Sequence, residues 1–123
     1  MKKIKISVIG LGFVGLSLAA INANFGFKTI GIEIDKKKLE NIQNGKPDFY
    51  EPGIEMLLKN AIKKKTILFS DKLENILDTD ITFVTVGTPS DKSGKIDLKK
   101  FKKAIFELSK ILNNKKTQHT VVI

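Results

Sequence analysis

The sequence of 123 residues contains no cysteine and no tryptophan, and it has a single histidine, His119. The absence of cysteine excludes disulfides, thiolate metal ligands and a cysteine nucleophile within these residues. No stretch approaches the roughly 18 apolar residues of a membrane-spanning helix, so we expect no membrane partner. The apolar start is short and interrupted by Lys5 and Ser7, which favours a first strand over a signal peptide. We therefore expect a cytoplasmic protein of one domain.

Arginine is also absent, so lysine alone supplies the positive side of a net charge of +9. An excess of positive charge can indicate a nucleic-acid partner. Here the residue best suited to bidentate base contacts is missing, and the lysines are scattered. We therefore expect no nucleic-acid partner and interpret the lysines as solvated faces. Their clusters lie at residues 36–38, 63–65, 99–100, 102–103 and 115–116.

Strand-like and helix-like patterns alternate along the chain. Apolar, β-branched segments predict strands over residues 4–9, 29–34, 66–69, 81–86 and 119–123. Amphipathic segments predict helices over residues 14–24, 36–44, 54–63 and 98–112, and a short helix ending at residue 77. Gly26 and Gly45 can end the first two helices, while Asp35 and Asp97 can cap the second and the longest. The alternation predicts an α/β fold, a Rossmann-type doubly wound parallel sheet of strand order 3-2-1-4-5 in a single domain.

A glycine motif follows the first strand directly and begins the first helix. Gly10, Gly12 and Gly15 form the spacing G-x-G-x-x-G within "VIGLGFVG". Gly10 permits a tight turn, Gly12 lets the backbone approach a pyrophosphate, and Gly15 lets the helix pack closely on the strand. The free N–H groups at the helix N-terminus favour phosphate binding. The motif predicts a dinucleotide site, and the alternative is a strand–helix turn without a ligand.

An acidic residue stands near the end of the second strand, in the segment "IGIEID". Glu33 follows Gly10 at close to the roughly 20-residue offset expected of a ribose-binding carboxylate. Such a carboxylate repels a 2′-phosphate, so NAD is favoured over NADP. Asp35 is the alternative ribose ligand, although it is also placed to cap the next helix. Lysines 36–38 leave a second alternative open, because lysine can accommodate a 2′-phosphate.

The segment "TFVTVGTPSDKSGKIDL" leaves the carboxyl end of the fourth strand. In the predicted strand order, this end lies beside the first strand, at the switch point where ligands bind in open α/β sheets. Gly87 and Thr88 would therefore face the cofactor, and Pro89 would stiffen the turn. The alternative is an ordinary strand-to-helix loop.

Four segments together resemble the N-terminal NAD-binding domain of the UDP-glucose/GDP-mannose dehydrogenases, and most closely the UDP-glucose 6-dehydrogenase branch. They are "GLGFVGLSLA", "GIEIDKKKLENIQNG", "FYEPGIEMLL" and "VGTPSDKSGKIDL", and they span nearly the whole chain. Phe13 stands where tyrosine is common in the family. The resemblance implies no metal, and it implies NAD contacts at Gly10, Leu11, Gly12, Phe13, Val14, Gly15, Glu33, Lys38, Val86, Gly87, Thr88, Pro89 and Ser90.

The resemblance also implies an activity. Family members oxidise the C6 alcohol of a nucleotide sugar to a carboxylate in two NAD-dependent steps, and a cysteine nucleophile holds the aldehyde-level intermediate. UDP-glucose, oxidised to UDP-glucuronate, is the expected substrate, and the full-length protein is expected to be a homodimer. The 123 residues include no cysteine, so we expect this chain alone to be inactive. The role of residues 50–53 stays open between a buried shaping loop and a substrate contact.

Two rival functions remain. Another β-hydroxyacid-type dehydrogenase would lack the loops at residues 45–58 and 82–98. A regulatory nucleotide-binding module would be complete at about this length but would not need those loops. The chain ends in the strand-like "HTVVI". We expect Ile123 to mark an engineered or natural truncation rather than a natural terminus.

Overall fold

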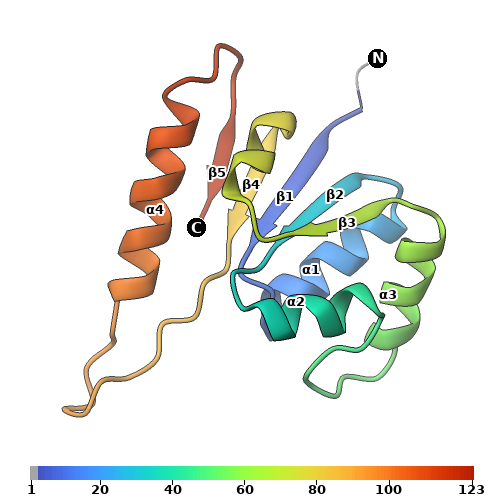
Figure 1. The fold of residues 1–123 in the computed structure, drawn as a ribbon, viewed down its shortest axis with the longest axis horizontal. Helices are drawn as coiled ribbons and strands as arrows, with labels where there is room; N and C mark the ends of the chain where they lie inside the picture. Colours follow the sequence, from blue (N-terminus) through green and yellow to red (C-terminus); the bar gives the residue numbers. More distant parts are fainter. Residues whose placement is uncertain (1–2) are drawn as a thin grey trace.

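The computed structural model describes residues 3–123 and has strands and helices in alternation (Figure 1). The first half contains β1 (Lys5–Ile9), α1 (Phe13–Asn24), β2 (Lys28–Ile32), α2 (Lys36–Gln43) and α3 (Ile54–Lys63). The second half contains β3 (Ile67–Ser70), the 3-10 helix η1 (Leu73–Asp78), β4 (Ile81–Val84), α4 (Lys99–Leu112) and β5 (Thr120–Val122). All strand pairs are parallel and the order is β3-β2-β1-β4-β5, which confirms the predicted topology.

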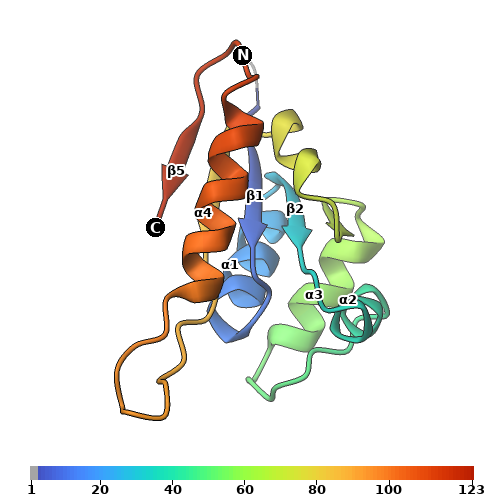
Figure 2. The ribbon, with the colours of Figure 1, turned by 60° about the vertical axis from the view of Figure 1, so that its left-hand side comes forward.

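The central strand β1 divides the core into two layers, because successive side chains of a strand point to opposite faces. Ile6 and Val8 contribute to a cluster with residues of α1, α2 and α3, including Leu16 and Leu58. Ile9 contributes to a second cluster, with residues of η1 and α4. Figure 2 shows α4 and α1 on opposite sides of the sheet. Both ends of the glycine turn are therefore anchored in packed structure.

The helices end at the predicted capping residues, except that the N-cap of α4 lies one residue later than predicted. The Asp35 carboxylate accepts the Lys38 N–H at 3.1 Å and caps α2. Gly26 and Gly45 have φ of +92° and +77°, the left-handed conformation expected after a helix. Asp97 lies one residue too early to be the cap of α4, which is Leu98, although its carboxylate accepts the Lys99 N–H at 2.9 Å.

Two strands are shorter than predicted at the edge that holds the glycine turn. The predicted strands over 29–34 and 81–86 end at Ile32 and Val84. Their partner β1 ends at Ile9, and Gly10 then turns away with a φ of +88°, so regular pairing with β1 ends there. One further backbone bond follows each strand, from the Glu33 N–H to the Ser70 carbonyl at 3.0 Å and from the Thr85 N–H to the Ile9 carbonyl at 2.9 Å, so both residues are held beside the turn.

The strand β5 is an exposed edge rather than a buried strand, although its β-branched sequence predicts burial. All three of its residues are exposed. Its backbone pairs in parallel with β4, and the preceding His119 adds a side-chain contact, with its Nε2 2.7 Å from the Thr82 hydroxyl. That hydroxyl lies 2.7 Å from the buried Ser7 hydroxyl on β1. Within residues 3–123, no helix has the length and apolar character needed to cross a membrane.

Candidate functional site

The glycine turn lies at the carboxyl ends of β1 and β4, where the chain order of the sheet reverses. The Gly10 N–H donates to the Ile32 carbonyl at 2.9 Å, so the turn is tied to β2. A Cβ at Gly10 would lie 3.0 Å from the Thr85 carbonyl oxygen, and the φ of +88° already disfavours a side chain. Both the conformation and the close approach of Thr85 require glycine at this position.

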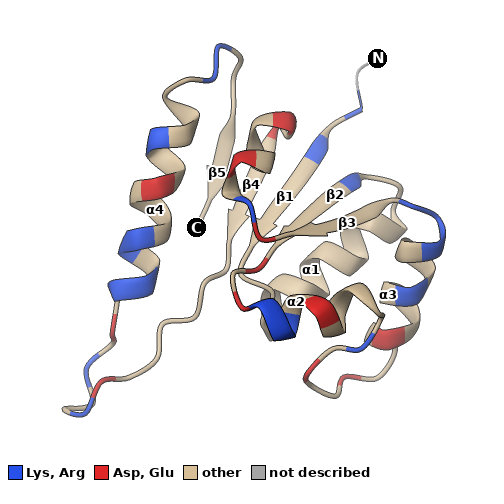
Figure 3. Ribbon diagram, viewed as in Figure 1, with Lys and Arg blue, Asp and Glu red and all other residues tan. Residues whose placement is uncertain are grey.

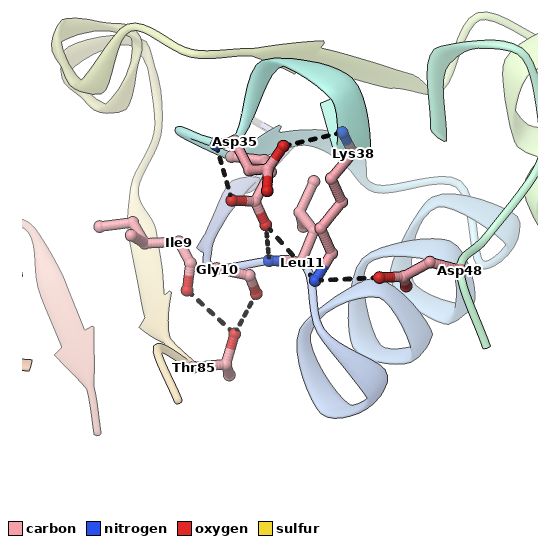
Figure 4. Close-up of polar contacts among 8 residues, drawn as sticks. Ile9, Gly10, Leu11, Asp35, Lys38, Asp48 and Thr85 are labelled. Atoms are coloured by element: carbon pink, nitrogen blue, oxygen red, sulfur yellow. Dashed lines mark hydrogen bonds and ion pairs between the residues drawn. The ribbon is translucent and has the colours of Figure 1, made fainter. Parts of the chain in front are cut away.

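Gly15 joins the helix to the turn by close packing. A Cβ there would lie 1.8 Å from the Gly10 carbonyl oxygen and 2.4 Å from the Thr85 hydroxyl. That hydroxyl lies 2.7 Å from the Gly10 carbonyl and 3.0 Å from the Ile9 carbonyl (Figure 4). Thr85 therefore fastens β4 to the turn, a role that sequence reasoning missed. The only sequence signal was a hydroxyl residue at the end of an apolar strand.

Gly12 has the opposite surroundings, since no heavy atom outside its chain neighbours lies within 4 Å of an added Cβ. It is the N-cap residue of α1, and no side chain caps that helix end. The N-terminus of α1 thus has no capping side chain, and the space beside Gly12 is open. This combination fits a phosphate group at the helix N-terminus.

The two candidate ribose ligands differ in what already binds them. Glu33 follows β2, and its Oε1 accepts the Leu11 N–H at 3.1 Å while its Oε2 accepts the Asp35 N–H at 3.1 Å. The carboxylate of Glu33 therefore lies directly on the glycine turn. The carboxylate of Asp35 is directed to the N-terminus of α2, where Lys38 donates to it. Glu33 is placed beside the turn, and Asp35 acts as a helix cap.

Lys38 lies between the Glu33 carboxylate and the loop that follows α2. Its Nζ is 3.9 Å from the Glu33 Oε1 and 3.6 Å from the Asp48 Oδ2 (Figure 4). The same loop also contacts the turn through an aromatic pair, with the Phe13 and Phe49 ring centroids 5.1 Å apart. Asp48 and Phe49 were not predicted as site residues, because nothing local in the sequence shows which way this loop folds.

The predicted contacts after β4 divide into two groups. Val86 packs against the second core cluster, and its Cα would lie 3.1 Å from a Cβ at Gly10, so it borders the turn. Gly87, Thr88, Pro89 and Ser90 are exposed, and the chain here extends away from the sheet (Figure 1). Gly87 has no heavy atom within 4 Å of an added Cβ, so this segment leaves room beside the turn.

The distal part of this loop is held by its own hydrogen bonds. Asp91 accepts from the Ser93 hydroxyl at 2.7 Å and from the Lys95 N–H at 3.0 Å. The Ser93 hydroxyl first, and then the Lys95 N–H, hold the pKa of the Asp91 carboxyl below its ordinary value. Ser90 pairs with Ile96 in an isolated antiparallel bridge. Residues 91–95 therefore form a turn closed by its own hydrogen bonds.

All four residues from 50 to 53 are exposed, and Tyr50 is 89% exposed. They line an open surface pocket with Met56 and Lys59 at the start of α3. Tyr50 is therefore not part of a buried shaping loop. Among residues 3–123, no group of three or more His, Asp or Glu side chains is arranged to hold a metal ion.

A parallel doubly wound sheet, a glycine turn open at Gly12 and a carboxylate resting on that turn define a dinucleotide-binding domain of the Rossmann type. Residues 4–123 match the UDP-glucose/GDP-mannose dehydrogenase family, NAD binding domain. The chain belongs to this family and is its NAD-binding domain.

The relatives include two kinds of sugar-nucleotide enzyme. GDP-mannose 6-dehydrogenase of Pseudomonas syringae is 36% identical over 97% of this chain and 27% of its own. UDP-glucose 6-dehydrogenase AglM of Haloferax volcanii is 34% identical over 96% of this chain and 27% of its own. The crystal structure of a ternary complex of GDP-mannose dehydrogenase from Pseudomonas aeruginosa superposes with a TM-score of 0.92, at 33% identity, over 96% of this chain and 27% of that one. The chain thus spans about a quarter of these relatives, and their similar identities favour neither sugar.

Proposed function

We propose that the turn from Gly10 to Gly15 binds the pyrophosphate of NAD and that Glu33 binds the adenosine ribose. The open space at Gly12, in front of the uncapped N-terminus of α1, supports the first assignment. The position of the Glu33 carboxylate, 3.1 Å from the Leu11 N–H, supports the second and carries the proposal. Lys38 would lie at the ribose, and residues 86–90 would border the cofactor. Bound NAD supplies a hydride acceptor.

At the level of the whole protein, we propose a dehydrogenase that oxidises the C6 alcohol of a nucleotide sugar to a carboxylate in two NAD-dependent steps. The named relatives support this reaction class. The loop sequences favour UDP-glucose, with UDP-glucuronate as the product, and GDP-mannose is the alternative that the Pseudomonas relatives support. The same resemblance supports a cytoplasmic homodimer.

The nucleotide assignment is tested by isothermal titration of the chain with NAD, NADH and ATP. We expect NAD and NADH to bind, and tighter binding of ATP would instead indicate a regulatory nucleotide module. Glu33→Ala should weaken NAD binding by about 1–3 kcal/mol, because charge-assisted hydrogen bonds to the ribose are lost. Asp35→Ala is the matched control, since it removes the α2 cap and should lower stability while leaving NAD affinity nearly unchanged. The reverse pattern would assign the ribose to Asp35.

The substrate is tested on the protein that carries this domain, by NADH formation with UDP-glucose and with GDP-mannose. We expect two NADH per UDP-glucose consumed and much slower turnover of GDP-mannose. Faster turnover of GDP-mannose would correct the sugar, and absence of turnover with either would contradict both proposed substrates.

A further inference from the structure

The lysine beside the proposed ribose site is shared between two carboxylates from different parts of the chain. Lys38 Nζ lies 3.9 Å from Glu33 Oε1 and 3.6 Å from Asp48 Oδ2. The side chains of Glu33 and Lys38 are 11% and 23% exposed, so they interact partly out of water, and Asp48 is 49% exposed at the rim. The three side chains together carry one net negative charge.

We propose that Asp48 is a specificity-determining residue that makes the site select NAD over NADP by neutralising Lys38. This inference rests on the proposed binding of the adenosine ribose at Glu33. NADP differs from NAD by a 2′-phosphate, which carries a charge of roughly −1.5 to −2 near neutral pH. A lysine at the ribose would attract that phosphate. Lys38 belongs to the run of lysines 36–38, which from the sequence alone is compatible with NADP binding. Asp48 cancels this attraction from the loop side, while Glu33 repels the phosphate directly.

Asp48 is held in place although it lies at the surface. The next residue, Phe49, packs its ring on Phe13 of the glycine turn, with centroids 5.1 Å apart at a tilt of 58°. Phe49 also packs against the first core cluster. The backbone next to Asp48 is therefore fixed relative to the turn, and Figure 4 shows the Asp48 carboxylate directed at the Lys38 ammonium. An anchored carboxylate can keep the lysine paired when a ligand enters.

The test measures the affinities of NAD and NADP for the wild-type chain and for Asp48→Asn, an isosteric change that removes only the charge. We expect the NAD preference to narrow roughly fivefold at low ionic strength, through tighter NADP binding, with NAD affinity changed less than about twofold. Added salt should reduce the difference. An unchanged NAD/NADP ratio would overturn the proposal, and so would an equal change for both nucleotides, because that would indicate a loop-positioning role.

Two further variants test whether Asp48 changes the NAD/NADP ratio through Lys38. In a Lys38→Met background, Asp48→Asn should change the ratio less than about twofold, because the cation that Asp48 neutralises is gone. An equal effect in both backgrounds would overturn the proposed route through Lys38. Glu55→Gln is the matched control, since Glu55 pairs with Lys59 at 2.6 Å in the neighbouring helix. The NAD/NADP affinity ratio of Glu55→Gln should equal that of the wild type. Thermal unfolding verifies that each variant is folded.

The role of Asp48 and the NAD site itself are contradicted by different results. If the wild-type chain binds NAD but Asp48→Asn leaves the preference unmoved, the role of Asp48 is wrong and the NAD site stands. If the wild-type chain binds neither nucleotide, the proposed NAD site is wrong and the role of Asp48 falls with it.

Discussion

Gly12 and Gly15 lie three residues apart in one turn, yet a methyl group added at each meets opposite surroundings. At Gly15 the added Cβ would overlap the Gly10 carbonyl oxygen at 1.8 Å, so the helix would have to move from the strand. At Gly12 the Cβ would occupy open space in front of α1. The motif therefore combines a glycine required by close packing with a glycine that has open space beside it.

This contrast predicts a separation of stability from binding. Gly15→Ala should lower the free energy of unfolding by about 2 kcal/mol or more, because the backbone cannot relax without shifting α1. Gly12→Ala should change it by less than about 1 kcal/mol but weaken NAD binding by about tenfold, because the methyl group fills the pyrophosphate space. Urea unfolding and isothermal titration measure the two effects. A stable Gly12→Ala variant with unchanged NAD affinity would contradict the cradle assigned to this position.

At the scale of elements, a chain of polar side chains fastens the exposed edge strand β5 to the sheet. His119 joins Thr82, Thr82 joins Ser7, and the His119 Nδ1 lies 3.0 Å from the Thr79 carbonyl and 2.8 Å from Lys115 Nζ. The two valines of β5 are 37% and 40% exposed, so this edge strand is less buried than the central strand β1. The contacts of His119 therefore support the backbone pairing that joins β5 to β4.

The same contacts predict a pH dependence. Burial first, and then the nearby Lys115 charge, lower the pKa of His119, against the smaller opposing effects of the Thr79 carbonyl and Asp80. The folded chain therefore binds fewer protons than the unfolded chain near the ordinary histidine pKa of about 6.5, so stability is full above that pH and falls below it. His119→Gln should flatten the fall in unfolding free energy between about pH 7.5 and pH 5. An unchanged slope would assign the acid sensitivity to other groups.

At this scale, the sequence predicted correctly the features that depend on residues adjacent in the chain. The alternation of elements, the Asp35 cap and the glycine turn are local patterns, and the structure has all three. The ends of β2 and β4 were wrong by two residues, because they depend on where the partner β1 stops. Thr85 and Asp48 were missed for the same reason, since each reaches the site only through tertiary contacts. The roles of side chains that meet at the glycine turn from distant parts of the sequence can therefore be assigned only from the three-dimensional structure.

At the scale of the whole molecule, the net charge of +9 is spread rather than concentrated. Figure 3 shows basic residues on α2, α3 and α4 with acidic residues interspersed on the same helices. Within this basic background the proposed ribose site is locally acidic, because Glu33 and Asp48 outnumber Lys38. The local balance of charge, not the total, should therefore decide which dinucleotide binds.

The residue types present limit how much of the expected reaction this chain can perform. The reaction expected of the family requires a cysteine nucleophile for the aldehyde-level intermediate, and the 123 residues contain none. The chain should therefore bind NAD yet form no NADH with UDP-glucose or GDP-mannose, as followed by absorbance over hours at high protein concentration. The protein that carries this domain is the positive control under the same conditions. Sugar-dependent NADH formation by the 123-residue chain, abolished by Gly12→Ala, would contradict this division and place the sugar chemistry within these residues.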